Sequence, residues 1–222
     1  MISIRNLTKT FRVRGEVKTV IDNLDLTIPT GRAVALLGRN GAGKSTLLEM
    51  IAGTQRPDSG TIQSDGTISW SVGLGSSFHR ELTGAQNVRF IARVYGVDTD
   101  ELVRFVGNFA ELGKHFHMPV RSYSQGMRAR LGFGTSMGIH FDTYLVDEVT
   151  AVGDAAFKQK SRAVFRDRMQ TSGAIMVSHS MQQVRNFCDA GLVLENGRAH
   201  YFDNLEDAIA HHEDNMERAA AI

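Results

Sequence analysis

The chain has 222 residues, of which 42% are hydrophobic and 22% charged, and its formal net charge is +1 at pH 7. These values are typical of a globular protein with a sizeable core, and the near-neutral charge argues against a nucleic-acid binder. No stretch approaches the ~20 apolar residues that cross a bilayer, and the first residues lack the apolar segment of a secretory signal. Cys188, the single cysteine, excludes an internal disulfide and is expected to be a small buried side chain.

The N-terminal region predicts sheet followed by a strand, a turn and a helix. Leu24, Leu26 and Ile28 alternate with polar residues, as in a half-buried strand. Residues 33–37 are instead a continuous apolar run, which is typical of a parallel strand covered on both faces. A glycine-rich turn follows, and residues 44–52 then read as a helix that stops before a glycine.

The middle of the chain changes from sheet to helix. Residues 61–72 predict two short strands that pair as a hairpin around Asp65-Gly66. Apolar residues then recur at helical spacing, first from Val88 to Tyr95 and again from Leu102 to Leu112. We therefore interpret about 80–138 as a helical insertion in one domain that spans 1–222.

Sheet returns in the C-terminal part. Residues 143–146 and 174–177 are short apolar runs that predict further buried strands. A last hairpin is expected at Asn196-Gly197. The final amphipathic helix is expected to carry three apolar residues, namely Leu205, Ile209 and Met216. The alternation of strands and helices predicts an α/β fold with a parallel-sheet core.

Residues 38–45 match the phosphate-loop pattern G-x-x-x-x-G-K-[ST] in full. The glycines let backbone N–H groups surround phosphate oxygens, and the following helix presents its positive end to the same anion. Lys44 is expected to reach the terminal phosphates, and the Ser45 hydroxyl to bind Mg²⁺. The predicted nucleotide-contacting residues of this loop are Gly38, Arg39, Asn40, Gly41, Ala42, Gly43, Lys44, Ser45 and Thr46.

Two carboxylates, Asp147 and Glu148, close the apolar run at 143–146. At the end of a parallel strand near a phosphate loop, Asp147 is placed to hold Mg²⁺, usually through water. Glu148 can accept a proton from an attacking water. Taken alone the pair could also be a solvated strand end, and the phosphate loop favours the catalytic interpretation.

Tyr-Ser-Gln-Gly-Met from residue 123 resembles the signature motif of ABC (ATP-binding cassette) proteins, most often Leu-Ser-Gly-Gly-Gln. Ser124 is suited to cap a helix whose positive end, with the Gly126 N–H, attracts an anion. The resemblance implies the P-loop ABC ATPase fold: a RecA-like parallel-sheet core, an N-terminal antiparallel β-subdomain and a helical subdomain. It also implies that Ser124 and Gly126 contact ATP held by a second copy in a head-to-tail dimer.

The same resemblance assigns further residues. His179 corresponds to the switch histidine that contacts the terminal phosphate, and Phe11 to an aromatic residue that stacks on adenine. With Lys44 and Glu148, His179 completes the implied catalytic set. His79 stands where most ABC proteins have the glutamine of the Q-loop. Imidazole can still donate or accept a hydrogen bond, so coupling of His79 to Mg²⁺, water or the permease can be retained, but glutamine's role does not carry over directly.

Four segments look like ATP-binding subunits of bacterial polysaccharide exporters, namely those from Gly38, Phe78, Tyr123 and Asp147. This resemblance implies a peripheral homodimeric ATPase on the cytoplasmic face of the inner membrane, using ATP and Mg²⁺ and bound to an integral-membrane permease. The chain length is closer to the capsule type than to the O-antigen type. Two alternatives stay open: an ABC subunit for another cargo (O-antigen, teichoic acid, lipid, drug or imported solute), and a soluble ABC ATPase acting on ribosomes or DNA.

Overall fold

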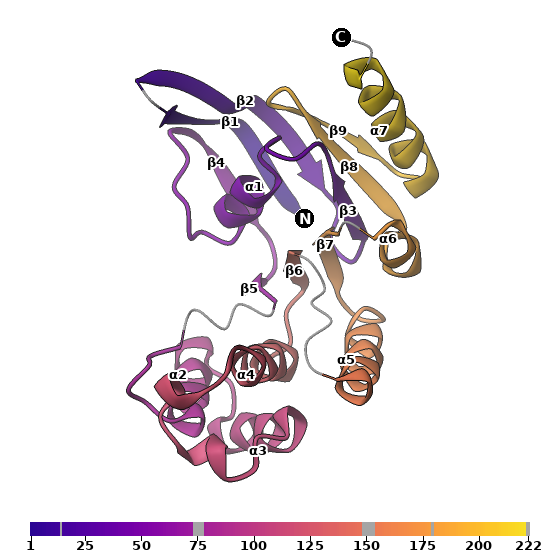
Figure 1. Ribbon diagram of the computed structural model, residues 1–222. Coiled ribbons are helices and arrows are strands. Elements are labelled where there is room, and N and C mark those ends of the chain that lie inside the picture. Colours follow the sequence, from indigo (N-terminus) through magenta and orange to yellow (C-terminus); the bar gives the residue numbers. More distant parts are fainter. Residues whose placement is uncertain (14, 73–77, 148–153, 179, 221–222) are drawn as a thin grey trace. The chain divides into compact units, whose positions relative to one another are not determined.

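The computed structural model describes residues 1–13, 15–72, 78–147, 154–178 and 180–220, which form two compact units (Figure 1). The first unit holds two sheets and the helices α1 (Lys44–Ile51), α6 (Met181–Phe187) and α7 (Leu205–Ala220). The second unit is helical and includes α5 (Ala155–Arg168), which lies outside the expected insertion. Among the described residues, no helix is both long enough and apolar enough to span a membrane.

The smaller sheet of the first unit is antiparallel, with strand order β2-β1-β4. Its strands are β1 (Ile2–Val13), β2 (Glu16–Ile28) and β4 (Ser59–Ser64). Leu24, Leu26 and Ile28 are all buried along β2. The alternating pattern therefore predicted this strand and its inner face correctly.

The larger sheet has strand order β5-β6-β7-β3-β8-β9 and is parallel up to β8. Its strands are β5 (Ile68–Ser71), β6 (Thr143–Asp147), β7 (Gly173–Val177), β3 (Ala33–Leu37), β8 (Ala190–Glu195) and β9 (Arg198–Phe202). The apolar runs in β3, β6 and β7 are buried, as expected for central parallel strands. Together the two sheets and the helices confirm the predicted α/β class.

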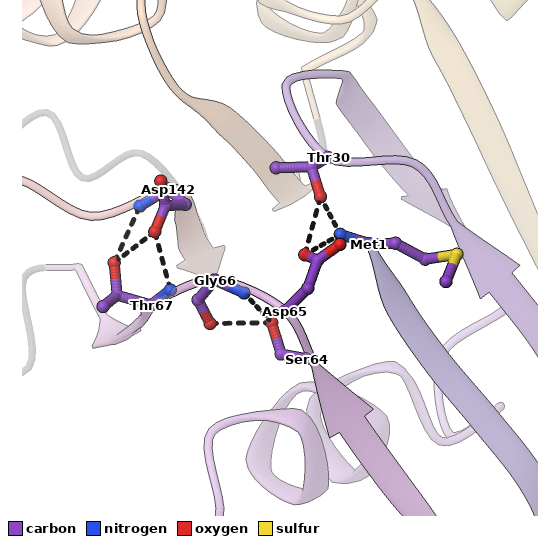
Figure 2. A network of polar contacts seen from close by, with 7 residues as sticks. All are labelled: Met1, Thr30, Ser64, Asp65, Gly66, Thr67 and Asp142. Atoms are coloured by element: carbon purple, nitrogen blue, oxygen red, sulfur yellow. Dashed lines mark hydrogen bonds and ion pairs between the residues drawn. The ribbon is translucent and has the colours of Figure 1, made fainter.

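The predicted hairpin around Asp65-Gly66 is wrong, although both of its strands exist. β4 pairs with β1, and β5 pairs with β6 in the other sheet. Figure 2 shows why the chain does not fold back on itself: Asp65 binds the N-terminal ammonium and Thr30, while Asp142 accepts hydrogen bonds from both the N–H and the hydroxyl of Thr67. These contacts direct the two strands into different sheets, which local turn chemistry could not predict.

The C-terminal hairpin and helix follow the sequence more closely. Asn196 and Gly197 both have positive φ, 49° and 78°, as the expected tight turn between β8 and β9 requires. α7 then packs on β3, β8 and β9 with Leu205 and Ile209 buried. Met216, the third apolar residue expected on this helix, is 45% exposed, and its neighbour Asn215 is buried. The part of α7 that contains His212 and Asn215 lies beside the loop that follows β3.

The second unit is built from α2 (Gly84–Tyr95), α3 (Thr99–Ala110), α4 (Gln125–Gly138) and α5, with short 3-10 turns at Gly113–His117 and Val120–Ser122. Phe109 of α3 is the centre of its core. Its ring stacks on Phe133 of α4 at 5.8 Å and meets Phe157 of α5 edge-on at 5.3 Å. These contacts tie three helices together.

Candidate functional site

The loop between β3 and α1 has a shape that two of its glycines make possible. Gly38 and Gly43 have φ of +153° and +103°. A Cβ at Gly38 would lie 2.5 Å from the Leu194 carbonyl oxygen of β8, and one at Gly43 would lie 2.4 Å from Cγ1 of Val20 in β2. Any larger side chain at either position would therefore force the loop off the sheet.

Lys44 is the first residue of α1, and its side chain reaches back to the preceding loop. Its Nζ donates hydrogen bonds to the carbonyl oxygens of Gly38 at 2.6 Å and Arg39 at 3.1 Å. Partial burial lowers the pKa of Lys44, and the negative charge of Asp147 partly opposes that shift. The Lys44 ammonium is thus held against the loop, in a position to contact a phosphate bound there.

α1 begins without a side-chain cap among the described residues, since its N-cap is Gly43 in a left-handed conformation. The first N–H groups of a helix have no partner within the helix. Gly41 has open space where a Cβ would stand, and Ser45 is exposed in the first turn. The helix start is therefore accessible to an anion.

Asp147 ends β6 and pairs in register with Val177 of β7, the neighbour of β3. It therefore sits at the carboxyl edge of the parallel strands, the edge at which ligands bind in such sheets. α1 contacts β6, the strand that Asp147 ends, and the negative charge of Asp147 raises the pKa of Lys44 against the effect of burial. Ser45 and Asp147 supply hydroxyl and carboxylate oxygens, the donor types that Mg²⁺ prefers, so the residues present fit a magnesium ion bound together with phosphates.

Phe11 lies on β1, paired with Lys18 of β2, and is 37% exposed. The ammonium of Lys9 lies 5.4 Å from the centre of its ring. The ring is thus available at the surface of the antiparallel sheet for a further contact.

The signature turn belongs to the second unit. Ser124 is the N-cap of α4, and its hydroxyl accepts a hydrogen bond from the Met127 N–H at 3.2 Å. Tyr123 is buried, and its hydroxyl donates to the His115 carbonyl oxygen at 2.6 Å. Ser124 and Gly126 themselves are exposed. The turn is therefore anchored from beneath and open to a neighbouring molecule.

A charged network joins the signature helix to the start of α5. Arg130 of α4 donates to the carboxylate of Asp154 at 2.9 Å and packs over the Phe157 ring at 4.4 Å. Asp154 caps α5, accepting a hydrogen bond from the Phe157 N–H at 2.9 Å. That backbone hydrogen bond, aided by Arg130, lowers the pKa of Asp154.

His79 also lies in the second unit, in a turn fixed by the buried Asn87. The Asn87 amide accepts a hydrogen bond from the His79 N–H at 2.8 Å and donates to the His79 carbonyl oxygen at 3.1 Å. The exposed imidazole accepts a hydrogen bond from the Glu81 N–H at Nδ1, 3.3 Å away. Its Nε2 is then the ring nitrogen that carries the proton in the neutral form.

Glu148 and His179 lie outside the described residues. Within the described part, the structure brings Lys44, Ser45 and Asp147 together in the first unit. Sequence reasoning missed the side chains that support the loop, above all Val20 against Gly43. It predicted the C-terminal helix α7 but not its position beside the loop. No local pattern signals these contacts, because they join segments far apart in the chain.

A phosphate loop between a central parallel strand and a helix, with a carboxylate at the same sheet edge, defines a P-loop nucleotide-binding protein. The family model for ABC transporters matches residues 21–151. The chain belongs to the ABC transporter family, and it is an ATPase of that family.

The comparisons with individual proteins agree with this assignment. The chain is 51% identical to the polysialic acid transport ATP-binding protein KpsT of Escherichia coli, covering 94% of this chain and 95% of that one. It is 39% identical to the capsule polysaccharide export ATP-binding protein CtrD of Neisseria meningitidis, covering 94% and 96%. Its fold is similar to the dimeric, post-hydrolysis structure of the ATP-binding cassette MJ0796 bound to ADP and Pi, with a TM-score of 0.75 and 21% identity over 92% of this chain and 99% of that one.

Proposed function

We propose that this protein is the ATP-hydrolysing subunit of an exporter that moves a cell-surface polysaccharide, of the capsule type, across the inner membrane. The observation that carries the proposal is the identity to KpsT and CtrD over nearly the full length of all three chains. Both relatives are named for polysaccharide transport or export. The two units described above then act as one nucleotide-binding domain.

In this proposal ATP binds at the loop between β3 and α1. The backbone N–H groups of the loop and the Lys44 ammonium hold the phosphates, and Phe11 stacks on adenine. Ser45 and Asp147 hold Mg²⁺, which neutralises charge on the phosphates when bound. The short contacts of Lys44 with loop carbonyls support its role, because they already place the cation inside the cradle.

Glu148 is proposed as the base that accepts a proton from the attacking water, and His179 as the residue that positions that water near the terminal phosphate. Both residues follow strands, β6 and β7, which end at the sheet edge where Asp147 lies. The His79 turn is proposed to transmit the state of the site, with its Nε2–H donating a hydrogen bond to water, including water bound to Mg²⁺, or to the permease.

The catalytic unit is proposed to be a head-to-tail homodimer in which Ser124 and Gly126 of one copy contact ATP in the other. Support comes from the exposure of the signature turn and from its position at the start of α4, where the helix dipole is positive. Had this turn been buried within its own unit, it could not have faced a second copy.

A membrane-embedded permease is the second proposed partner. α2 carries three apolar side chains that face outward: Phe90 and Val94 are 62% exposed and Tyr95 is 43% exposed. Exposed apolar groups of this size gathered on one helix are typical of a protein contact surface. Through this contact the protein would lie at the cytoplasmic face of the inner membrane.

Replacing Glu148 by Gln tests the enzymatic part of the proposal. The variant should still bind ATP but lose turnover and accumulate as a dimer, seen by size-exclusion chromatography with ATP. Glu101→Gln on the surface of α3 provides a control that should behave like the wild type. Full turnover by Glu148→Gln would remove Glu148 from the role of base.

The cargo is tested separately, by purifying the protein with its permease and identifying the glycan that accumulates inside cells when Glu148→Gln replaces the wild type. An intracellular capsule-type polysaccharide is the expected result. Accumulation of O-antigen, a lipid or another cargo would move the protein to a different transport class without affecting its assignment as an ATPase.

A further inference from the structure

Lys9 of β1 is a buried cation that the proposed nucleotide site does not yet use. The residue is 8% exposed, and lysine is almost never buried to this degree unless it is paired. Its ammonium donates hydrogen bonds to the Arg56 carbonyl oxygen at 2.8 Å and to the Asp58 carboxylate at 3.0 Å. Both acceptors lie between α1 and β4, so Lys9 joins β1 to the segment that follows the nucleotide-binding helix.

Asp58 is itself fixed to β1. Its carboxylate accepts hydrogen bonds from the Thr10 N–H at 2.7 Å and from the Thr10 hydroxyl at 2.8 Å, and its own N–H donates to the Thr8 carbonyl oxygen at 2.9 Å. The hydrogen bond from Lys9, followed by those from Thr10, lowers the pKa of Asp58 to about 2. Asp58 is therefore ionised at neutral pH and holds the Lys9 ammonium in one place.

The same ammonium covers one face of the Phe11 ring. Lys9 Nζ lies over that ring, 5.4 Å from its centre. The Lys9 side chain is only 10% exposed, whereas Phe11 is 37% exposed. The ring face that meets the ammonium is thus turned toward the protein, and the exposed part of the ring lies away from Lys9.

Phe11 projects from the sheet on the side of the phosphate loop. It pairs in register with Lys18 of β2, and Lys18 lines a pocket together with loop residues 38–42. Side chains that are directly opposite each other on antiparallel strands project from the same face of the sheet. An adenine that stacks on Phe11 can therefore belong to a nucleotide whose phosphates are held by this loop.

We infer that Lys9 is a positioning residue for the adenine base, holding one face of the Phe11 ring so that the other face is presented to the purine. The inference rests on the proposed stacking of Phe11 on adenine. A ring that is already held loses less freedom when the base binds. The ammonium also attracts the π electrons of the ring, which reduces the repulsion between two stacked aromatic faces.

The binding test compares ADP with ribose 5-diphosphate, which keeps the sugar and both phosphates but lacks the base. Lys9→Met in the full chain removes the charge and keeps a long side chain. By calorimetry, its affinity for ADP should fall by roughly three- to tenfold, while its affinity for ribose 5-diphosphate should stay unchanged. Equal losses for the two ligands would overturn the inference, because they would show a general loosening of the site.

Arg5→Met is the matched control. Arg5 lies on the same strand and is exposed, so the substitution removes a cation from β1 at a position two register pairs away from the Lys9 contacts. This variant should bind both ligands like the wild type. If Arg5→Met lowers the ADP affinity as much as Lys9→Met does, the effect is one of general charge and the inference is overturned.

Phe11→Leu tests whether Lys9 acts through the ring. The single variant should lose ADP affinity, and adding Lys9→Met to it should cause no further loss. A full additional loss in the double variant would overturn the inference. If Phe11→Leu itself leaves ADP affinity unchanged, the proposed stacking falls together with the inference. If Phe11→Leu lowers the affinity and Lys9→Met does not, the inference alone falls.

A second substitution covers the case in which Lys9→Met does not fold, as judged by circular dichroism. Lys9→Gln keeps an N–H donor for the Arg56 carbonyl oxygen and removes only the charge. It should show the same selective loss of ADP affinity. Wild-type affinity for ADP in folded Lys9→Gln would overturn the inference.

Discussion

The N-termini of α1 and α4 are both proposed to contact the phosphates of ATP, but they differ in how their first N–H groups are capped. α1 begins after Gly43, with no side-chain cap among the described residues and with Lys44 folded into the preceding loop. α4 begins at Ser124, whose own hydroxyl caps the helix through Met127. The first start leaves its N–H groups for a ligand, whereas the second satisfies one of them internally.

The difference indicates a division of labour. The loop before α1 packs against β2 and β8, so its shape depends on the first unit alone, and we expect it to bind nucleotide within one chain. The α4 start is exposed and held from beneath by the buried Tyr123. In the proposed dimer this exposed turn completes the nucleotide site of a second copy. Substitutions at the two starts should therefore fail in different steps.

The largest effect is expected for Lys44→Ala. Loss of the ammonium removes the main charge at the α1 start, and turnover should fall by roughly 10³-fold, at the upper end for a single electrostatic group. Nucleotide affinity should fall as well, which equilibrium binding of a fluorescent ATP analogue by the isolated chain would measure. Unchanged affinity would show that the phosphates are held elsewhere.

Ser124→Ala should reduce turnover by roughly 10²-fold while leaving ATP binding by a single chain intact. The variant also loses a helix cap, at a cost of about 1 kcal/mol in the free energy of unfolding. Asp98→Ala is the matched control, because Asp98 caps α3 through Glu101 in the same unit. It should show a similar stability loss in urea and retain turnover. If both variants lose turnover equally, the role of Ser124 is structural only.

Gly43→Ala tests whether the α1 start depends on its backbone shape. Alanine would be strained at φ +103° and would meet Val20 at 2.4 Å, so a loss of about 1–3 kcal/mol in stability is expected, together with weaker ATP binding. Combining it with Val20→Ala should relieve the clash but not the strain, and thus recover part of the stability in denaturant unfolding. No loss in the single variant would mean that the loop adapts freely.

The smallest effect concerns a third helix start, that of α5, which is capped by the charged Asp154. Its pKa is lowered in the folded state, so this contribution to stability is fully present above about pH 4 and is lost as pH falls through the lowered pKa. Asp154→Asn should remove that part of the acid dependence, whereas Ser124→Ala should not change it. Urea midpoints from about pH 6 to about pH 3 provide the measurement. Identical acid limbs for Asp154→Asn and the wild type would contradict the assignment.

The parts of the site that could be read from the sequence are those encoded by short local patterns. The phosphate loop, the buried strands beside it and the Ser124 cap each depend on neighbouring residues, and the structure has all three. The Asp65-Gly66 turn shows the limit of this reasoning. Its residues favour a hairpin, but contacts with Thr30 and Asp142 send β4 and β5 into different sheets.

Burial on α7 shows the same limit at a single position. Met216 was expected as one of the apolar residues of this amphipathic helix, yet it is 45% exposed, whereas its polar neighbour Asn215 is buried. Helical periodicity predicts only the average apolar face of a helix. The burial of a single residue also depends on neighbouring segments, which periodicity does not describe. The buried Asn215 amide, whose Nδ2 has no hydrogen-bond partner among the described residues, could be found only from the coordinates.

The sequence by itself determined the chemistry of the nucleotide site, because glycines, a lysine and a serine at fixed spacing suffice to specify a loop that binds phosphate. Only the tertiary structure decided how that loop is supported and what lies beside it. Val20, Leu194 and α7 come from distant parts of the chain. Their contacts with the loop arise from the packing of strands and helices, which no local pattern contains.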